Sequence, residues 1–118
     1  MQNVLYQYNA FVTSVYDGDT CTVDIDLGLH TWVRGEKIRL MRINAPEIRG
    51  KDREKGLLSR DYLRELILGK KIIIGTFKDK KGKYGRYLGE IWLFMNGEEP
   101  VNVNDLLVEK GFAEYHEY

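Results

Sequence analysis

The 118-residue chain has a single cysteine, Cys21, and no net charge, because eighteen basic residues balance eighteen acidic ones. One cysteine excludes a disulfide within the chain and a zinc site built on cysteines. Its position in a β-like run predicts a small buried side chain. With zero net charge, no overall field draws the protein to nucleic acid or to an anionic membrane. Such a partner would have to be bound by a local patch.

Long apolar runs and targeting signals are also missing. No apolar stretch approaches the roughly 20 residues that span a bilayer. The N-terminal sequence MQNVLYQYNAF has neither the basic region nor the continuous apolar region of a signal peptide. We therefore expect a protein that does not contact membranes and is cytoplasmic by default. Since no repeat or linker is visible, residues 1–118 are expected to form one domain, monomeric by default.

Five segments have the composition or alternation of β-strands. Within 21–27, for example, Val23 and Ile25 share one face and polar residues take the other. The sequence GLHTWVRG, residues 28–35, has a glycine at each end and is interpreted as a connection rather than a strand. The predicted strands are 9–16, 21–27, 36–43, 70–77 and 86–94.

An amphipathic helix is predicted over Lys51–Leu68, where apolar residues recur at spacings of three and four. A short second helix is predicted over 105–110, with Asn102 or Asn104 as its N-cap. Each helix is followed by a glycine that would end it. The order βββ-α-ββ-α predicts a mainly β fold with two to three α-helices, in which five strands close an OB-type barrel. The predicted apolar stripe of the long helix comprises Leu58, Tyr62, Leu63, Leu66 and Ile67.

Two carboxylates, Asp17 and Asp19, flank Gly18 in the sequence VYDGDT between the first two strands. Asp-Gly is a common signal for a hairpin turn, which would explain the stretch without any further role. Asp19 would also project where the turn re-enters the sheet, a suitable position for a cation ligand. The stretch alone leaves both interpretations open.

Three further stretches carry charged residues at specific positions: IRLMRINAPE at 38–47, KYGRYLGEI at 83–91 and VNVNDLLVEKGFAEY at 101–115. Taken singly, their charges are compatible with ordinary ion pairs and solvated loops. Together with DGDT, their order and spacing resemble the staphylococcal nuclease (thermonuclease-like) family, from about Val12 to Phe112. The resemblance implies a five-stranded OB-type barrel that hydrolyses phosphodiester bonds in DNA or RNA with calcium, leaving 3′-phosphate ends.

The resemblance also implies a calcium site formed by Asp19, Asn44 and the backbone carbonyl of Ala45, with Asp17 as a supporting carboxylate. Calcium prefers several oxygen ligands, which this set can offer. Asn44 departs from the family pattern, which has an aspartate there, so the site loses one negative charge. We expect weaker calcium binding with activity retained. Asn44 could equally cap the turn that leads to Pro46, and the two roles are compatible.

Three residues match the catalytic residues of the family. Arg39 and Arg86 correspond to two arginines that grip the scissile phosphate, and Glu47 to the glutamate that orients or deprotonates the attacking water. Guanidinium groups suit this task because their planar fork matches phosphate oxygens. A non-catalytic OB-type module that binds single strands or a protein partner is the competing interpretation. Such modules typically lose this set, and its presence favours the enzyme.

The remaining matches concern the nucleotide of the substrate. Lys83 and Tyr84 fall on the loop that touches its terminal phosphate, within the basic segment KDKKGKYGR at 78–86. Beside a phosphate site, this segment would be a local patch for a polyanion. Tyr115 and Tyr118 near the C-terminus are candidates for stacking on a base, with packing on the barrel as the alternative.

Overall fold

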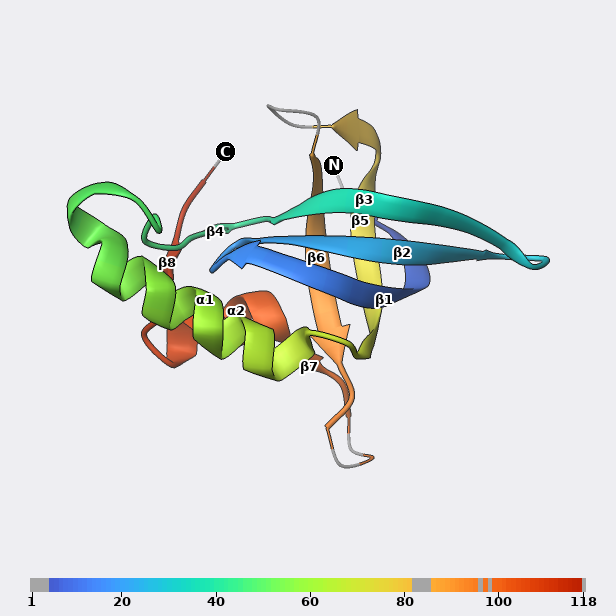
Figure 1. The fold of residues 1–118 in the computed structure, drawn as a ribbon. Helices are drawn as coiled ribbons and strands as arrows, with labels where there is room; N and C mark the ends of the chain where they lie inside the picture. Colours follow the sequence, from blue (N-terminus) through green and yellow to red (C-terminus); the bar gives the residue numbers. More distant parts are fainter. Residues whose placement is uncertain (1–4, 82–85, 96, 98, 118) are drawn as a thin grey trace.

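The computed structural model describes residues 5–81, 86–95, 97 and 99–117. Five strands form a closed barrel in which neighbours run antiparallel in the order β3-β2-β1-β5-β6, and a parallel pairing of β3 with β6 closes the ring (Figure 1). The predicted five-stranded OB-type barrel is therefore confirmed. The barrel strands are β1 (Leu5–Asp17), β2 (Thr20–Gly28), β3 (Thr31–Leu40), β5 (Lys71–Lys81) and β6 (Tyr87–Leu93).

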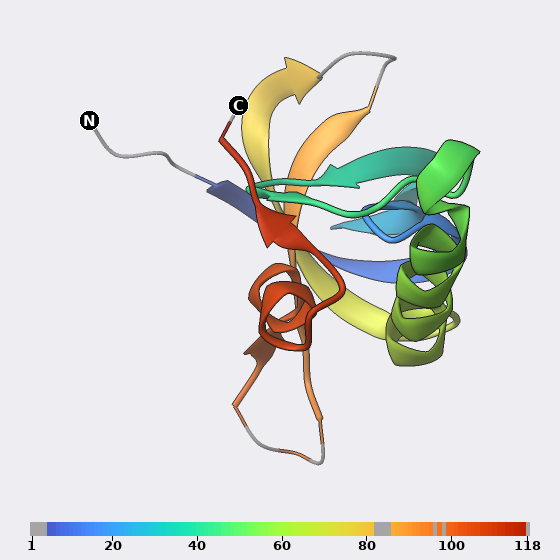
Figure 2. The same cartoon turned by 90° about the vertical axis from the view of Figure 1, so that its left-hand side faces the viewer.

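Two α-helices and three two-residue strands complete the described fold. Figure 2 shows the two helices on separate flanks of the barrel, with the short strand β8 above α2 in this view. Strand β8 pairs antiparallel with β4, and β7 pairs with the end of β6. No helix in the described ranges is long and apolar enough to cross a membrane. The bounds are β4 (Ile43–Asn44), a 3₁₀ turn (Gly50–Asp52), α1 (Arg53–Ile67), β7 (Val101–Asn102), α2 (Val103–Glu109) and β8 (Glu114–Tyr115).

The interpretation of residues 28–35 as a connection is wrong, because β3 begins at Thr31. Only Leu29 and His30 form the turn, with φ values of 55° and 60°. Across the hairpin, Asp24 accepts a hydrogen bond from the backbone N–H of Gly35 at 2.9 Å. The carboxylate thus holds the two strands together at the glycine. The long β2–β3 hairpin extends away from the helices (Figure 1).

The core fills the barrel with aliphatic side chains. Val23 and Ile25 point inward, as their alternation predicts, and Cys21 is fully buried beside them. The full burial of Cys21 confirms its predicted place as a small buried side chain, and burial raises the pKa of its thiol to about 12. The largest fully buried hydrophobic side chains are Val12, Val23, Ile38, Leu40, Ile43, Leu63, Ile67, Ile74, Ile91, Val103 and Leu107.

The buried face of α1 differs from the predicted stripe. Leu58 is 62% exposed, whereas Gly56 and Ser59 are buried together with Leu63 and Ile67. Small residues occupy the first half of this face because the helix there approaches neighbouring backbone too closely for larger side chains. Tyr62 and Leu66 pack against the core as predicted, and Leu58 is the one residue of the predicted stripe that lies outside the buried face.

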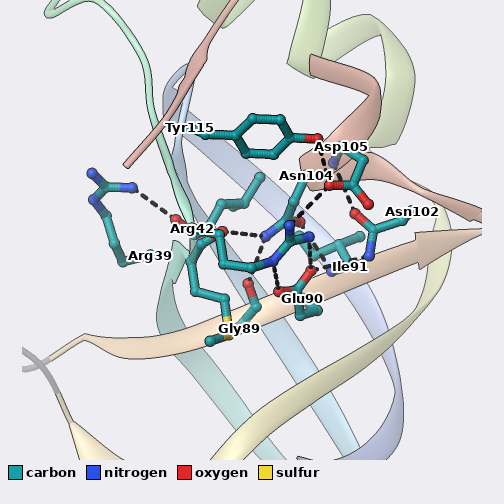
Figure 3. A network of polar contacts seen from close by, with 11 residues as sticks. Arg39, Arg42, Gly89, Glu90, Ile91, Asn102, Asn104, Asp105 and Tyr115 are labelled. Carbon is teal, nitrogen blue, oxygen red and sulfur yellow. Dashed lines mark hydrogen bonds and ion pairs between the residues drawn. The ribbon is translucent and has the colours of Figure 1, made fainter. Parts of the chain in front are cut away.

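Helix α2 resolves the choice between its two candidate caps. The side chain of Asn102 accepts a hydrogen bond from the backbone N–H of Asp105 at 2.8 Å, so Asn102 is the N-cap. Asn104 is instead completely buried and links three backbone groups of neighbouring segments (Figure 3). A buried amide requires such partners. They are the carbonyls of Met41 and Gly89 and the N–H of Ile91.

Candidate active site

The β1–β2 turn is both a hairpin turn and a buried acidic site. The Asp17 carboxylate accepts a hydrogen bond from the backbone N–H of Asp19 at 3.1 Å, as a turn-forming aspartate does. Asp19 itself is only 6% exposed. Its Oδ1 accepts from the hydroxyl of Thr20 at 3.2 Å and its Oδ2 from the backbone N–H of Ala45 at 2.8 Å. Asp19 is therefore a fixed, buried carboxylate in a hairpin turn, and its role as a cation ligand stays a prediction.

Gly18 brings this turn into contact with two other segments. A Cβ atom at Gly18 would lie 2.7 Å from the Cβ of Ser59 on α1 and 2.8 Å from the Cβ of Ala45. Only glycine permits so close an approach. The hydrogen bond between Asp19 and Ala45 depends on it, because the same approach brings the end of β4 next to the turn.

The two carboxylates of the turn influence each other. Burial, and next the negative charge of Asp19, raise the pKa of Asp17 to about 7. The carboxyl groups of Asp17 and Asp19 thus lie close together in one partly buried turn of a protein that has no net charge.

Arg39 lies directly beside this acidic turn. It is opposite Thr20 in the β2–β3 register, and its side chain is 12% exposed. Its Nη2 lies 3.4 Å from Asp19 Oδ2 and donates to Asn44 Oδ1 at 2.9 Å. Its Nη1 donates to the carbonyls of Leu40 at 2.8 Å and Ile43 at 3.1 Å. The guanidinium is thus held in one orientation by the chain that follows it.

Residues 41–42, which follow Arg39 and Leu40, make a tight turn. Strand β3 therefore ends at Leu40 rather than at the predicted Ile43. Arg42 adopts a φ of 72°, which is rare for a residue with a side chain. Its Nη2 donates to Glu90 at 2.8 Å and its Nη1 to Asp105 at 2.9 Å (Figure 3). Hydrogen bonds, first with Glu90, raise the pKa of Arg42. These hydrogen bonds fix the turn at Arg42, and the carbonyls on either side of that turn, at Leu40 and Ile43, accept from Arg39.

Arg86 approaches the site from the other side of the barrel seam. The parallel pairing of Ile38 with Tyr87 places it next to β3. Its Nη1 donates to the hydroxyl of Thr20 at 3.2 Å, and that hydroxyl also bonds to Asp19. The two predicted phosphate-binding arginines and the predicted metal-binding carboxylate are therefore joined through common neighbours.

The other predicted site residues are placed less directly. Glu47 is exposed, and its carboxylate makes no hydrogen bond or ion pair with another described residue. Tyr115 is 58% exposed on β8, where its hydroxyl donates to Asp105 at 2.9 Å. Its register partner on β4 is Ile43, the neighbour of Asn44. Lys83 and Tyr84 lie outside the described residues, and nothing is described of the side chains of Lys78–Lys81.

Two site features are not predicted from the sequence. The Thr20 hydroxyl links Asp19 to Arg86. The sequence does not indicate this link, because a threonine after a turn is common in β-strands. The network of Arg42 with Glu90 and Asp105 is also absent from the predictions. A signal for it exists in the sequence, since Glu90 interrupts the apolar run of β6, and a charge in such a position requires a buried partner.

The donors near Asp19 suit a hard cation in chemical type. Asp19 and Asn44 offer a carboxylate and an amide oxygen, and both lie within reach of the same Arg39 nitrogen. Ala45 adds a backbone carbonyl from the adjacent position. Calcium accepts such oxygens and completes its shell with water or phosphate. Within the described ranges, no three His, Cys, Asp or Glu residues are grouped as a metal cluster, so a site here would contain few carboxylates.

Comparison with known proteins agrees with the geometry. The family model described as staphylococcal nuclease homologue matches residues 37–118, which is more than two thirds of the chain. Arg39, Asn44, Glu47 and Arg86 fall within this segment, whereas Asp19 precedes it. The chain is also 29% identical to the uncharacterized protein MJ1439 of Methanocaldococcus jannaschii over 127 residues. That alignment covers 90% of this chain but only 58% of the relative's length. This protein belongs to the staphylococcal nuclease homologue family, which is a family of nuclease type.

Proposed function

We propose that this protein is a calcium-dependent nuclease that hydrolyses phosphodiester bonds in DNA or RNA and leaves 3′-phosphate ends. Besides family membership, one observation carries the proposal. Arg39 contacts both Asp19 and Asn44, and Arg86 reaches Asp19 through the Thr20 hydroxyl. Two guanidinium groups, a buried carboxylate and an amide from separate segments thus meet at one end of the barrel.

In this proposal Arg39 and Arg86 bind the non-bridging oxygens of the scissile phosphate. Negative charge on these oxygens increases as water adds to phosphorus, and fixed guanidinium groups stabilise that charge. Arg39 is already oriented by two backbone carbonyls, so little reorganisation is needed. In this proposal both arginines act electrostatically, and neither donates a proton.

Glu47 is proposed to accept the proton of the attacking water. The oxygen of that water forms a bond to phosphorus while the bond from phosphorus to the 5′ oxygen breaks. The leaving oxygen takes a proton from solvent, which gives a 3′-phosphate and a 5′-hydroxyl. Calcium, held by Asp19, Asn44 and the carbonyl of Ala45, would neutralise charge on the phosphate when bound. Tyr115, Lys83 and Tyr84 are proposed to contact the nucleotide.

The proposal is tested by incubating supercoiled plasmid and single-stranded RNA with the protein in calcium and then in excess chelator. We expect cleavage in calcium alone, with ends that a polymerase extends only after phosphatase treatment. Cleavage that persists in chelator would reject the metal-dependent mechanism. A wild-type protein that binds but never cuts would instead be a non-catalytic module. Glu47→Gln protein, purified in parallel, controls for a contaminating nuclease.

Asn44→Asp is expected to lower the calcium concentration for half-maximal activity by about tenfold, because ligand charge helps to set calcium affinity. The measurement is a calcium titration of cleavage rate for both proteins. Gln7→Glu makes the same amide-to-carboxylate change at an exposed position of β1 and should leave the titration unchanged. An unaltered midpoint for Asn44→Asp would show that the amide does not bind the ion and serves only to hold Arg39.

A further inference from the structure

A pocket of about 660 Å³ is lined by residues of the β1–β2 hairpin, β3 and α1, together with Ile48 and Arg86. Four of its lining residues are basic, and no carboxylate lines it. In a chain with equal numbers of acids and bases, such a one-sided lining marks a local site for an anion. The basic residues are Lys37, Arg60, Arg64 and Arg86.

The charges of Lys37, Arg60 and Arg64 are only partly compensated by the described residues. Arg60 pairs with Asp61 at 3.0 Å, and Asp61 is itself well exposed. Arg64 donates to the backbone carbonyl of Val15 at 3.3 Å, which leaves its positive charge unneutralised. Neither Arg64 nor Lys37 forms an ion pair with any described residue. A bound anion would relieve the repulsion among these groups.

The rest of the lining suits a nucleotide rather than a simple ion. Hydroxyl groups of Ser14 and Thr22 can donate to phosphate oxygens. Tyr16 also lines the pocket and is 52% exposed, so its ring is accessible to a base. Phosphate-binding cations beside an accessible aromatic ring are typical of sites for single-stranded nucleic acid.

The pocket is continuous with the candidate active site. Arg86 and Thr20 line it, and they are bonded to each other at 3.2 Å. The Thr20 hydroxyl also donates to Asp19 at 3.2 Å. A phosphate in the pocket would therefore lie next to the scissile phosphate that the proposed function places between Arg39 and Arg86.

We infer that this pocket binds the phosphate and base of a nucleotide adjacent to the scissile bond, so that the substrate is an unpaired strand longer than a dinucleotide. The location of the scissile bond rests on the proposed function, whereas affinity of the pocket for a single strand does not. Lys37 and Arg64 line the pocket, have no proposed catalytic role and form no ion pair with a described residue, so they allow the pocket to be tested separately from the catalytic groups.

The test uses the double variant Lys37→Gln/Arg64→Gln and a fluorescent eight-residue oligothymidylate, with anisotropy measured in chelator so that nothing is cut. We expect the dissociation constant to rise about tenfold. The slope of its logarithm against the logarithm of salt concentration should fall by about 0.7, the value for one lost phosphate contact on a single strand. Lys37→Gln alone, which removes no described side-chain hydrogen bond, should give a smaller change in the same direction.

Lys70→Gln/Lys110→Gln removes the same charge from exposed positions elsewhere and should alter the affinity less than twofold. An equal loss in this control, or unchanged affinity in the pocket variant, would overturn the inference. Thymidine monophosphate that bound as tightly as the octamer would also overturn it, since the pocket would then serve a free nucleotide.

A second arm compares cleavage of the octamer with cleavage of a dinucleotide that has one phosphodiester bond. The pocket variant should lose about tenfold in kcat/KM on the octamer and nothing on the dinucleotide. Equal losses on both would place Lys37 and Arg64 in the catalytic machinery and contradict a separate subsite. If the wild type cuts neither, the proposed function fails, while the anisotropy result still decides the binding role of the pocket.

Discussion

Replacing Glu47 with glutamine is expected to lower kcat for calcium-dependent cleavage by about 10²- to 10⁴-fold, the range for loss of a general base. The substitution keeps the size of the side chain but removes its ability to take a proton. Because the Glu47 carboxylate is exposed and bonds to no other described residue, the free energy of unfolding should not change. Single-turnover cleavage rates, together with chemical denaturation, measure both quantities.

The matched control is Glu114→Gln, on the strand that pairs with β4 and opposite Asn44. It removes the same charge from the same neighbourhood and should not reduce the rate. If Glu47→Gln cuts as well as the wild type, either Glu47 is not the base or the activity comes from a contaminant. Strand affinity in chelator should be the same for both variants, which separates chemistry from binding.

Gly56→Ala should lower the free energy of unfolding by about 3 kcal/mol or more, as severe overpacking does. An added Cβ would lie 2.1 Å from the carbonyl oxygen of Glu47 and 2.8 Å from the backbone nitrogen of Ile48. These are backbone atoms, so no side-chain rotation relieves the contact. The helix or the Glu47 segment must move, and activity should fall with stability. Urea denaturation and cleavage assays give the two readouts.

The sign of this effect is informative. In an open helix position, glycine to alanine stabilises by about 1 kcal/mol. Lys55→Ala, at the exposed neighbouring position, should change stability by less than about 0.5 kcal/mol. If Gly56→Ala stabilised the protein, α1 would not pack against the Glu47 backbone as described, and the positioning of Glu47 by the helix would be wrong.

Parts of the fold follow from local pattern, and others depend on contacts that no local pattern contains. The inward face of Val23 and Ile25 is local and is predicted correctly, and the local pattern narrows the cap of α2 to Asn102 or Asn104. Leu58 has the right spacing for the buried stripe of α1, yet it is exposed because the helix docks through Gly56. The two turn residues, Leu29 and His30, are neither glycine nor asparagine although both have a positive φ, so the hairpin is predicted too short.

The candidate site shows the same division. Motif order predicts that Asp19, Arg39, Asn44 and Arg86 belong together, and the structure places them in one bonded group. Their roles in binding and chemistry remain predictions. Sequence alone could not show that Thr20 connects Asp19 to Arg86, because that link depends on how β6 lies against β3.

Among the described residues, strands β3 and β6 pair at three positions, from Ile38–Tyr87 to Leu40–Gly89. Under the proposed roles, one phosphate-gripping arginine is on each of the two chain segments that this short junction joins. In a chain where β3 and β6 had not yet paired, Arg39 and Arg86 would not be held next to each other. Hydrolytic competence would then require that this junction has formed, so an unclosed barrel would bind the scissile phosphate with one arginine at most.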